Sequence, residues 1–209
     1  MASTPTGGST STSSSGDPLR VAVVLGSTRE GRFGPVVAKW LLGHAEPRTD
    51  MDVDLVDLLA TPVPQALPGF GAPVADADLA LLREITPRLA AADAFVLVTP
   101  EYNHSYPASL KNAIDWHNQQ WHAKPVGFVS YGGISGGLRA VEHLRTVLAE
   151  QHTVTIRNTV SFHDCGARFD QDGRAVDPAA DGAAKSMLDQ LAWWAHALRD
   201  ARQARPYAV

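Results

Sequence analysis

The chain has 209 residues, 44% of them hydrophobic, and a formal net charge of −4 at pH 7. This is enough apolar material for one domain with a packed core, and the charge excludes a basic surface for nucleic acid. No apolar run is long enough to span a bilayer, and the only cysteine, Cys165, permits no disulfide within the chain, which fits a reducing cytoplasm.

The first 18 residues are rich in Ser, Thr and Gly. They have neither the basic start nor the apolar run of a secretory signal, and they carry almost nothing to bury. We therefore predict a disordered tail over residues 1–18 and a single domain over residues 19–209.

From residue 19 onward, short apolar runs alternate with segments of helical periodicity. Pro35 suits the first position of a helix, whereas Pro87 lies inside a helical segment and is expected to kink or split it. Four prolines between residues 62 and 73 mark a loop. The predicted strands cover residues 19–25, 51–58, 94–99, 125–131 and 153–162, and the predicted helices cover 35–45, 76–92, 107–116, 137–151 and 181–201.

Strands that alternate with helices predict an α/β fold with a parallel sheet, covered on both faces by right-handed crossovers. Five strands fit a flavodoxin-like three-layer sandwich whose strand order is 2-1-3-4-5. In that order the first and third strands are neighbours and their connections leave on opposite faces. The crevice between them is the place where such sheets bind ligands.

The segment GSTREGRFG, residues 26–34, follows the first strand and leads into the first helix. Its glycines permit a sharp turn, Ser27 and Thr28 offer hydroxyls, and the start of a helix attracts an anion. Arg29 and Arg32 add forked donors that suit a phosphate. The alternative is a glycine-rich loop with two solvated arginines.

The spacing of this segment excludes two common phosphate loops. A Walker loop needs Lys and then Ser or Thr after its last glycine, but Arg32 and Phe33 follow Gly31. The GxGxxG fingerprint of dinucleotide-binding folds is also absent. The segment therefore predicts a site for a single phosphate group.

The segment PEYNHSYP follows the third strand, so it should share the crevice with the first loop. Pro100 and Pro107 stiffen the turn, Tyr102 and His104 offer flat faces for a ring system, and Asn103 offers amide groups. The alternative is a turn in which Asn103 takes a left-handed conformation and Tyr102 fills the core.

The segment SYGGISGG, residues 130–137, follows the fourth strand, and its glycines let backbone N–H groups face a ligand. It also matches GxSxG, the nucleophile elbow of serine hydrolases. That alternative makes Ser135 the nucleophile, with Asp164 or Asp170 and then His196 as partners. It lacks an oxyanion element and leaves the arginine loop unexplained.

The segments GSTREGRFGPVVAKWL, TPEYNHSYPASLKNAIDW and SYGGISGGLRAVEHLR, in this order and spacing, resemble the NADPH-dependent FMN reductase family. The resemblance extends from about residue 19 through the last strand. It implies a non-covalently bound FMN whose phosphate lies on the first loop and whose ring lies on the other two. The implied cofactor-binding residues are Ser27, Arg29, Arg32, Phe33, Gly34, Pro100, Glu101, Tyr102, Asn103, Ser130, Tyr131, Gly132 and Gly133.

The chain departs from the family's GSxRxxS loop pattern, because Arg32 and Phe33 stand where a serine is usual. Which groups donate to the phosphate therefore stays open. Within the family's scheme, the PEYN segment lines the isoalloxazine ring, and Gly132 and Gly133 present amides to its pyrimidine side.

The resemblance implies an enzyme that takes electrons from NADPH or NADH and passes them to a quinone, flavin, metal oxyanion or azo compound. No side chain is predicted to be catalytic, because the flavin carries the chemistry. A flavodoxin-like electron carrier without efficient nucleotide turnover is the nearest alternative. The family also implies a homodimer or homotetramer, and adjacent Trp193 and Trp194, which point to different faces of the last helix, favour such an interface.

No metal site is predicted. His117, His122, His163 and Cys165 lack the spacing of a ligand set.

Overall fold

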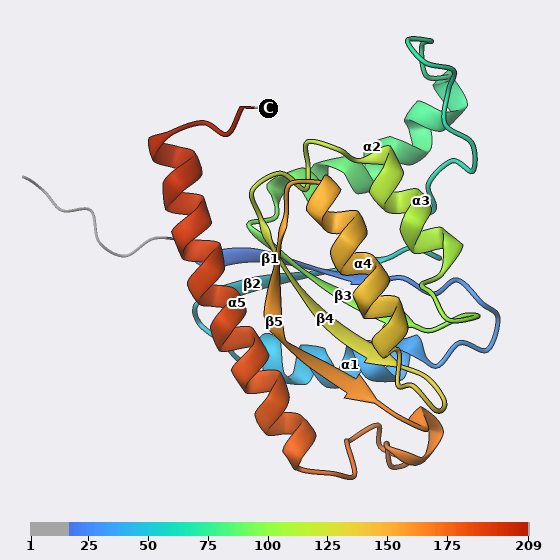
Figure 1. Ribbon diagram of the computed structural model, residues 1–209, viewed down its shortest axis with the longest axis vertical. Coiled ribbons are helices and arrows are strands. Elements are labelled where there is room, and N and C mark those ends of the chain that lie inside the picture. Colours follow the sequence, from blue (N-terminus) through green and yellow to red (C-terminus); the bar gives the residue numbers. More distant parts are fainter. Residues whose placement is uncertain (1–16, 209) are drawn as a thin grey trace, which may run out of the picture.

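The computed structural model describes residues 17–208, so residues 1–16 of the predicted tail lie outside the described residues. One parallel sheet has the order β2-β1-β3-β4-β5 with helices on both faces, which confirms the predicted flavodoxin-like sandwich (Figure 1). The strands are β1 (Leu19–Leu25), β2 (Met51–Asp57), β3 (Ala94–Pro100), β4 (Pro125–Tyr131) and β5 (Val154–Phe162). The helices are α1 (Gly34–Ala45), α2 (Asp76–Ala91), α3 (Ala108–Trp116), α4 (Leu138–Glu150) and α5 (Ala179–Ala204), with a short 3₁₀ helix, η1, at Cys165–Ala167.

The sheet separates two hydrophobic cores. Successive side chains of a strand point to opposite faces, so Val21 and Val23 pack with α1 and α5, whereas Ala22 and Val24 pack with α2, α3 and α4. Every residue of β3 and β4 is buried, as expected for strands covered on both faces. The edge strand β2 keeps several exposed positions, which explains its alternating sequence.

We expected Pro87 to kink or split its helix; α2 runs as one helix through Pro87, so a split is wrong. Proline removes one N–H, whose intrahelical acceptor would be the carbonyl of Arg83. Both residues are exposed, so water can satisfy this carbonyl. Ile85 and Leu89, buried on either side of the proline, keep both halves of the helix on the sheet.

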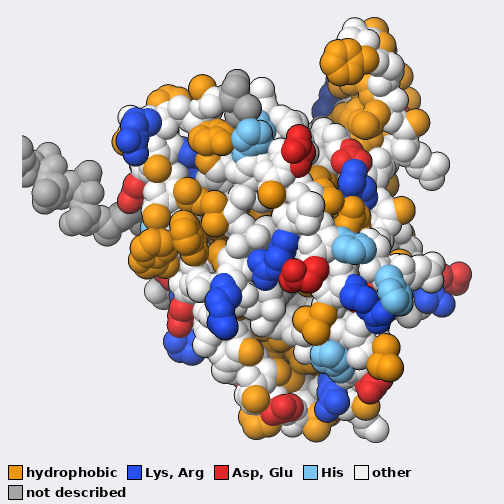
Figure 2. Space-filling view, viewed as in Figure 1, with side chains coloured by type: hydrophobic (Ala, Val, Ile, Leu, Met, Phe, Trp, Pro, Cys, Tyr) orange, Lys and Arg blue, Asp and Glu red, His pale blue; other side chains and the backbone are white. Residues whose placement is uncertain are grey.

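Residues 59–75, which we call the arm, project from the body of the molecule together with the start of α2 (Figure 1). The side chains of Asn112 and Trp116 fix its root, since both donate to the carbonyl of Pro64, at 2.7 and 2.8 Å. Figure 2 shows hydrophobic side chains gathered on this projection, and Phe70 and Leu67 are exposed there.

All five strands are parallel, so their carboxyl ends lie at one edge of the sheet and their amino ends at the other. The loops after β1, β3 and β4 therefore meet at the carboxyl end. The helix α5 finishes beside the amino end, as the position of the chain end marked C in Figure 1 shows. Within residues 17–208, no helix combines the length and the apolar character needed to cross a membrane.

Candidate functional site

The first loop, residues 26–34, is tied to the second by its buried serine. Ser27 Oγ and Tyr102 Oη share a hydrogen bond of 2.6 Å. Gly34 begins α1 in a crowded position, because a Cβ there would lie 2.6 Å from both Leu25 Cδ1 and Tyr131 Oη and would force these side chains to move. In the first turn of α1, Pro35 has no N–H and the Val36 N–H donates to the carbonyl of Phe33 at 3.0 Å, so the amide at Gly34 is the one that can face an anion.

The two arginines of this loop have different surroundings. Arg32 forms a two-pronged pair with Asp57 at the end of β2, at 2.6 and 2.5 Å, and also donates to the carbonyl of Ser27. Burial alone would raise the pKa of Asp57, but the Arg32 hydrogen bond, the Leu59 amide and the Arg32 charge together lower it. Arg29 is exposed. The structure therefore places Arg32 as a brace of the loop and Arg29 at its surface.

The second loop, residues 100–107, contains a hairpin with a two-residue turn. The backbone N–H groups of Tyr102 and Ser105 each donate to the other residue's carbonyl, at 2.8 and 3.0 Å. Asn103 and His104 between them both have positive φ, 50° and 69°, as the tight hairpin requires. This turn holds the Tyr102 ring toward the first loop and leaves Asn103 exposed at its tip.

Glu101 ties the second loop to the start of α4. Its side chain is 7% exposed, its carboxylate accepts from the Arg139 amide at 3.1 Å, and Arg139 Nε lies 2.7 Å away. Burial acts to raise the pKa of Glu101, but the Ser135 hydroxyl, the Arg139 charge and two helix amides outweigh it and lower that pKa. Glu101 is thus a charged cap of α4 at neutral pH, not a proton donor.

The third loop, residues 132–137, is held by its own backbone and by β5. Ser130 is buried and donates to the carbonyl of Gly136 at 2.8 Å. The Gly132 amide donates to the carbonyl of Phe162 at 3.1 Å, so it is already engaged. Gly133 is exposed, and open space lies where a Cβ would stand. Of the two glycines, Gly133 is thus the better placed to offer its N–H group to a ligand.

The hydroxyl of Tyr131 is the orphaned group of this site. It is buried, lies beside Gly34, and has no hydrogen-bond partner among the described residues. Burial, with the neighbouring Tyr102, raises the pKa of Tyr131 and outweighs the nearby Ser27 hydroxyl and Arg32 charge, which act to lower it, so Tyr131 stays protonated. A buried hydroxyl without a hydrogen-bond partner is costly, and a ligand that accepts a hydrogen bond from it relieves that cost. The three loops therefore surround unsatisfied donors.

The remaining predicted sets are not brought together. His196 contacts Arg199 near the amino end of the sheet, whereas Ser135 follows β4 at the carboxyl end, so the hydrolase triad is not assembled. No group of three metal-ligating side chains is found within residues 17–208. His117 is buried and bonded to Thr86 and to the carbonyl of Ala113.

Sequence reasoning missed three residues that hold the site. Asp57 braces the first loop, Arg139 pairs with Glu101, and Ser109 donates to the carbonyl of Gly26 at 2.5 Å. Each lies outside the loop that it holds. The only signal for Asp57 is an acidic residue at the end of β2, next to the strand that leads into the arginine loop.

A cavity of about 720 Å³ adjoins the first loop on the side of α3. Its wall combines polar Thr28 and Ser109 with apolar Leu58, Leu59 and Val63. None of the thirteen predicted cofactor-binding residues lines it, so it extends the crevice and does not coincide with it.

Residues 19–166 match the family model for NADPH-dependent FMN reductases. The chain belongs to the NADPH-dependent FMN reductase family. An NAD(P)H-dependent FMN reductase of Schizosaccharomyces pombe is 39% identical over 56% of this chain, and the match spans 60% of that relative's length.

Two further relatives are matched over more of their length. An FMN-dependent NADPH-azoreductase of Staphylococcus haemolyticus is 31% identical over 83% of this chain and 93% of its own. A quinone reductase of Escherichia coli K12 is 35% identical over 63% of this chain and 70% of its own length. Among solved structures, the flavoenzyme NAD(P)H:(acceptor) oxidoreductase FerB of Paracoccus denitrificans has a TM-score of 0.68 at 25% identity, covering 86% of this chain and 98% of FerB.

Proposed function

We propose that this chain is an FMN-dependent oxidoreductase that takes electrons from NADPH or NADH and delivers them to a quinone or azo compound. Family membership supports the cofactor and the nucleotide, and relatives named quinone reductase and azoreductase support the acceptor. The observation that carries the proposal is the set of three cross-tied loops around the orphaned hydroxyl of Tyr131.

The first loop is proposed to hold the phosphate of FMN. Ser27, Arg29 and the backbone amides of Phe33 and Gly34 would donate to it, since they combine a hydroxyl, a free guanidinium and the start of a helix. Arg32 would act indirectly, because both of its terminal nitrogens are engaged by Asp57. Its positive charge still lies next to the proposed phosphate position.

The second and third loops are proposed to hold the ring. Pro100 and Tyr102 would line one side, with Glu101 acting as the anchor that fixes their position relative to α4. Asn103 would contribute its amide at the rim. The polar edge of the ring would face the third loop. There the Gly133 N–H would donate to it, next to Ser130, Tyr131 and Gly132.

The two-electron chemistry between nucleotide and acceptor is supplied by FMN when it is bound. The residues of the chain bind, orient and hold charge. The carboxylate of Glu101 is occupied by Ser135, Arg139 and the helix amides, and the raised pKa of Tyr131 keeps its proton in place. Neither group is set up as a general acid, which agrees with a site whose chemistry resides in a cofactor.

The absorption spectrum of the purified protein tests this function. We expect flavin bands, release of intact FMN on heating, and parallel steady-state lines when NAD(P)H and a quinone are varied. Bound flavin without turnover of either nucleotide would favour the electron carrier. Absence of FMN binding, together with labelling of Ser135 by a fluorophosphonate, would overturn the flavin assignment.

A homodimer or homotetramer in the cytoplasm is also part of the proposal. Six of the large exposed hydrophobic side chains lie between residues 55 and 81, on or near the arm, and Trp193 is 65% exposed on α5. The single cysteine fits a reducing compartment. Light scattering of the FMN-loaded protein tests the assembly, and a mass of one chain at micromolar concentration with full activity would contradict it.

A further inference from the structure

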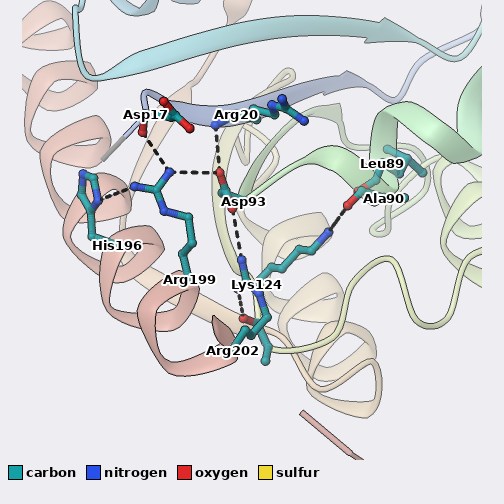
Figure 3. Close-up of polar contacts among 10 residues, drawn as sticks. Asp17, Arg20, Leu89, Ala90, Asp93, Lys124, His196, Arg199 and Arg202 are labelled. Carbon is teal, nitrogen blue, oxygen red and sulfur yellow. Dashed lines mark hydrogen bonds and ion pairs between the residues drawn. The ribbon is translucent and has the colours of Figure 1, made fainter. Parts of the chain in front are cut away.

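At the amino end of the sheet, two largely buried arginines contact one carboxylate, and a buried lysine lies nearby. Asp93 lies directly before β3, Lys124 directly before β4, and Arg199 and Arg202 lie near the end of α5; we call these four residues the amino-end cluster (Figure 3). Arg202 Nη2 is 3.2 Å and Arg199 Nη1 is 3.5 Å from the carboxylate of Asp93. Their side chains are 20%, 13% and 16% exposed, respectively, and Lys124 is 7% exposed.

The remaining polar contacts of these cations are to backbone carbonyls and, for Arg199, to the imidazole of His196 at 3.3 Å. Lys124 Nζ donates to the carbonyls of Leu89 and Ala90 at the end of α2, at 3.1 and 3.0 Å. Arg202 donates to the carbonyl of Ala123, and Arg199 to the carbonyl of Asp17 (Figure 3). These contacts satisfy N–H groups but do not cancel charge. The cluster keeps an excess of positive charge away from water, which is unfavourable.

The ionisation of these groups agrees with a shortage of negative charge. Burial, and then the charge of Arg202, lower the pKa of Lys124 to about 8, although Asp93 acts in the opposite direction. Burial also lowers the pKa of Arg202, where the attraction of Asp93 is opposed by the charge of Arg199.

A cavity of about 710 Å³ opens beside this cluster. Lys124 and Arg202 form part of its wall, together with Gln119, Gln120, His122 and Tyr207. The Nε2 atom of His122 is buried and has no partner among the described residues. The wall therefore holds two cations, two amide side chains and an imidazole nitrogen that is free to bond.

The flat rings of this wall lie close together. The His122 ring is 4.9 Å from that of His152 and 6.0 Å from that of Tyr207, between centroids. The volume lies in the range of small-molecule sites and exceeds the space that one inorganic anion needs.

We propose that this cavity binds a small organic oxyanion, a carboxylate or phosphate compound, which completes the charge of the amino-end cluster. The oxyanion would accept from Lys124, Arg202 and His122, and its organic part would lie against Tyr207 and the glutamine side chains. The site is separate from the proposed flavin site, because it lies at the opposite edge of the sheet. It does not depend on the proposed function.

Calorimetric titration of the FMN-loaded protein with citrate, AMP and inorganic phosphate tests this site, with sodium chloride at equal ionic strength as the reference. We expect saturable binding of citrate or AMP. In Arg202→Gln and His122→Ala the affinity should fall at least about tenfold, because each loses a hydrogen bond to a charged group. Arg88→Gln, which removes a half-buried arginine that is paired with Asp54 outside the cavity, is the matched control and should bind normally.

Asp93→Asn separates a binding site from a merely structural cluster. Removing the carboxylate that competes with the ligand should raise the affinity for the oxyanion, whatever it does to stability. Affinity should also fall as pH rises above about 8, because Lys124 loses its proton there. The other charged or titratable groups around this lysine are Arg199, Arg202, Asp93 and His122.

Several outcomes would overturn the proposal. They are no heat with any of the three probes at millimolar concentration, equal affinity in His122→Ala and Arg88→Gln, or unchanged affinity in Asp93→Asn. Binding of inorganic phosphate alone, equally in all variants, would identify an adventitious ion only. If Arg202→Gln fails to fold, His122→Ala and Asp93→Asn decide the question.

Discussion

At the carboxyl end of the sheet, charged side chains are paired one to one, whereas at the amino end two arginines share one carboxylate and a nearby lysine has only backbone carbonyls as hydrogen-bond partners. Arg32 pairs with Asp57, and Arg139 pairs with Glu101. Asp93, in contrast, is shared by Arg199 and Arg202, with Lys124 close by.

Charged side chains therefore have different roles at the two ends of the sheet. The pairs at the carboxyl end hold loops in place and leave a protonated tyrosine hydroxyl, amides and an exposed arginine for a ligand. At the amino end, positive side chains outnumber the nearby carboxylate, so part of the positive charge has no negative partner. At the carboxyl end, backbone geometry mainly forms the proposed ligand site. At the amino end, unbalanced positive charge does so.

The largest effect is expected from Gly137→Ala, which tests the backbone geometry of the carboxyl end. Gly137 has φ 87°, and a Cβ there would lie 2.6 Å from Ser130 Cβ. Backbone strain and overpacking together should cost about 2–6 kcal/mol of unfolding free energy. Chemical denaturation measures this loss.

Gly133→Ala is the control for this substitution, because nothing lies within 4 Å of its added Cβ and its φ is ordinary. It should unfold like the unaltered protein. Equal stability of the two variants would show that the third loop is not held rigidly.

The electrostatic imbalance of the amino end should appear in the pH dependence of stability. The pKa of Lys124 is about 8 in the folded protein and near 10.5 in the unfolded chain. Unfolding therefore takes up a proton between these values, and the free energy of unfolding should rise with pH across them by about 3 kcal/mol.

Lys124→Met should lack this rise when the two proteins are unfolded with urea at a series of pH values. A bound oxyanion should reduce the rise in the unaltered protein, because it stabilises the protonated lysine. Identical pH profiles for both proteins would mean that the cluster carries no excess charge.

Arg29→Ala tests the free charge of the carboxyl end. Loss of a charge-assisted hydrogen bond to the phosphate should cost about 1.5–3 kcal/mol, or at least about tenfold in FMN affinity. Riboflavin has no phosphate, so its affinity should barely change, and Arg29→Lys should recover part of the loss. Equal losses for FMN and riboflavin would remove Arg29 from the phosphate site.

The smallest effect is expected in a double-mutant cycle of Arg32→Ala and Asp57→Ala. Both residues brace the first loop, so the double variant should lose about as much stability as either single one, with a coupling of about 1–3 kcal/mol. The affinities for FMN and riboflavin should fall together. Additive losses would show that the pair is not the brace, and a loss confined to FMN would make Arg32 a direct ligand.

The sequence was sufficient for the fold because the relevant signals are local and repeated. Apolar runs and helical periodicity gave all five strands and the five α-helices to within a few residues, and parallel pairing followed from their alternation. Pro87 misled because the cost of a proline depends on where its freed carbonyl points, which a sequence does not state.

The two ends of the sheet were not equally predictable. Each loop of the carboxyl end is one contiguous motif, so its residues can be recognised together. The residues that brace these loops cannot be recognised in this way. Asp57 lies 25 residues from Arg32 in the sequence, and the two meet only because β2 pairs with β1. The amino-end cluster joins single residues that are up to 109 positions apart, as in Asp93 and Arg202, and no segment of the chain marks it.

The arm has a consequence for the continuity of the chain. Its root is pinned to α3 through Pro64, while its tip around Phe70 is exposed. An exposed tip is where proteases cut and where insertions are tolerated. A break there would leave β1 and β2 on one fragment and β3, β4 and β5 on the other, still joined through the pairing of β1 with β3. The arm is therefore a suitable place to split the protein into two fragments, as in a split reporter or sensor.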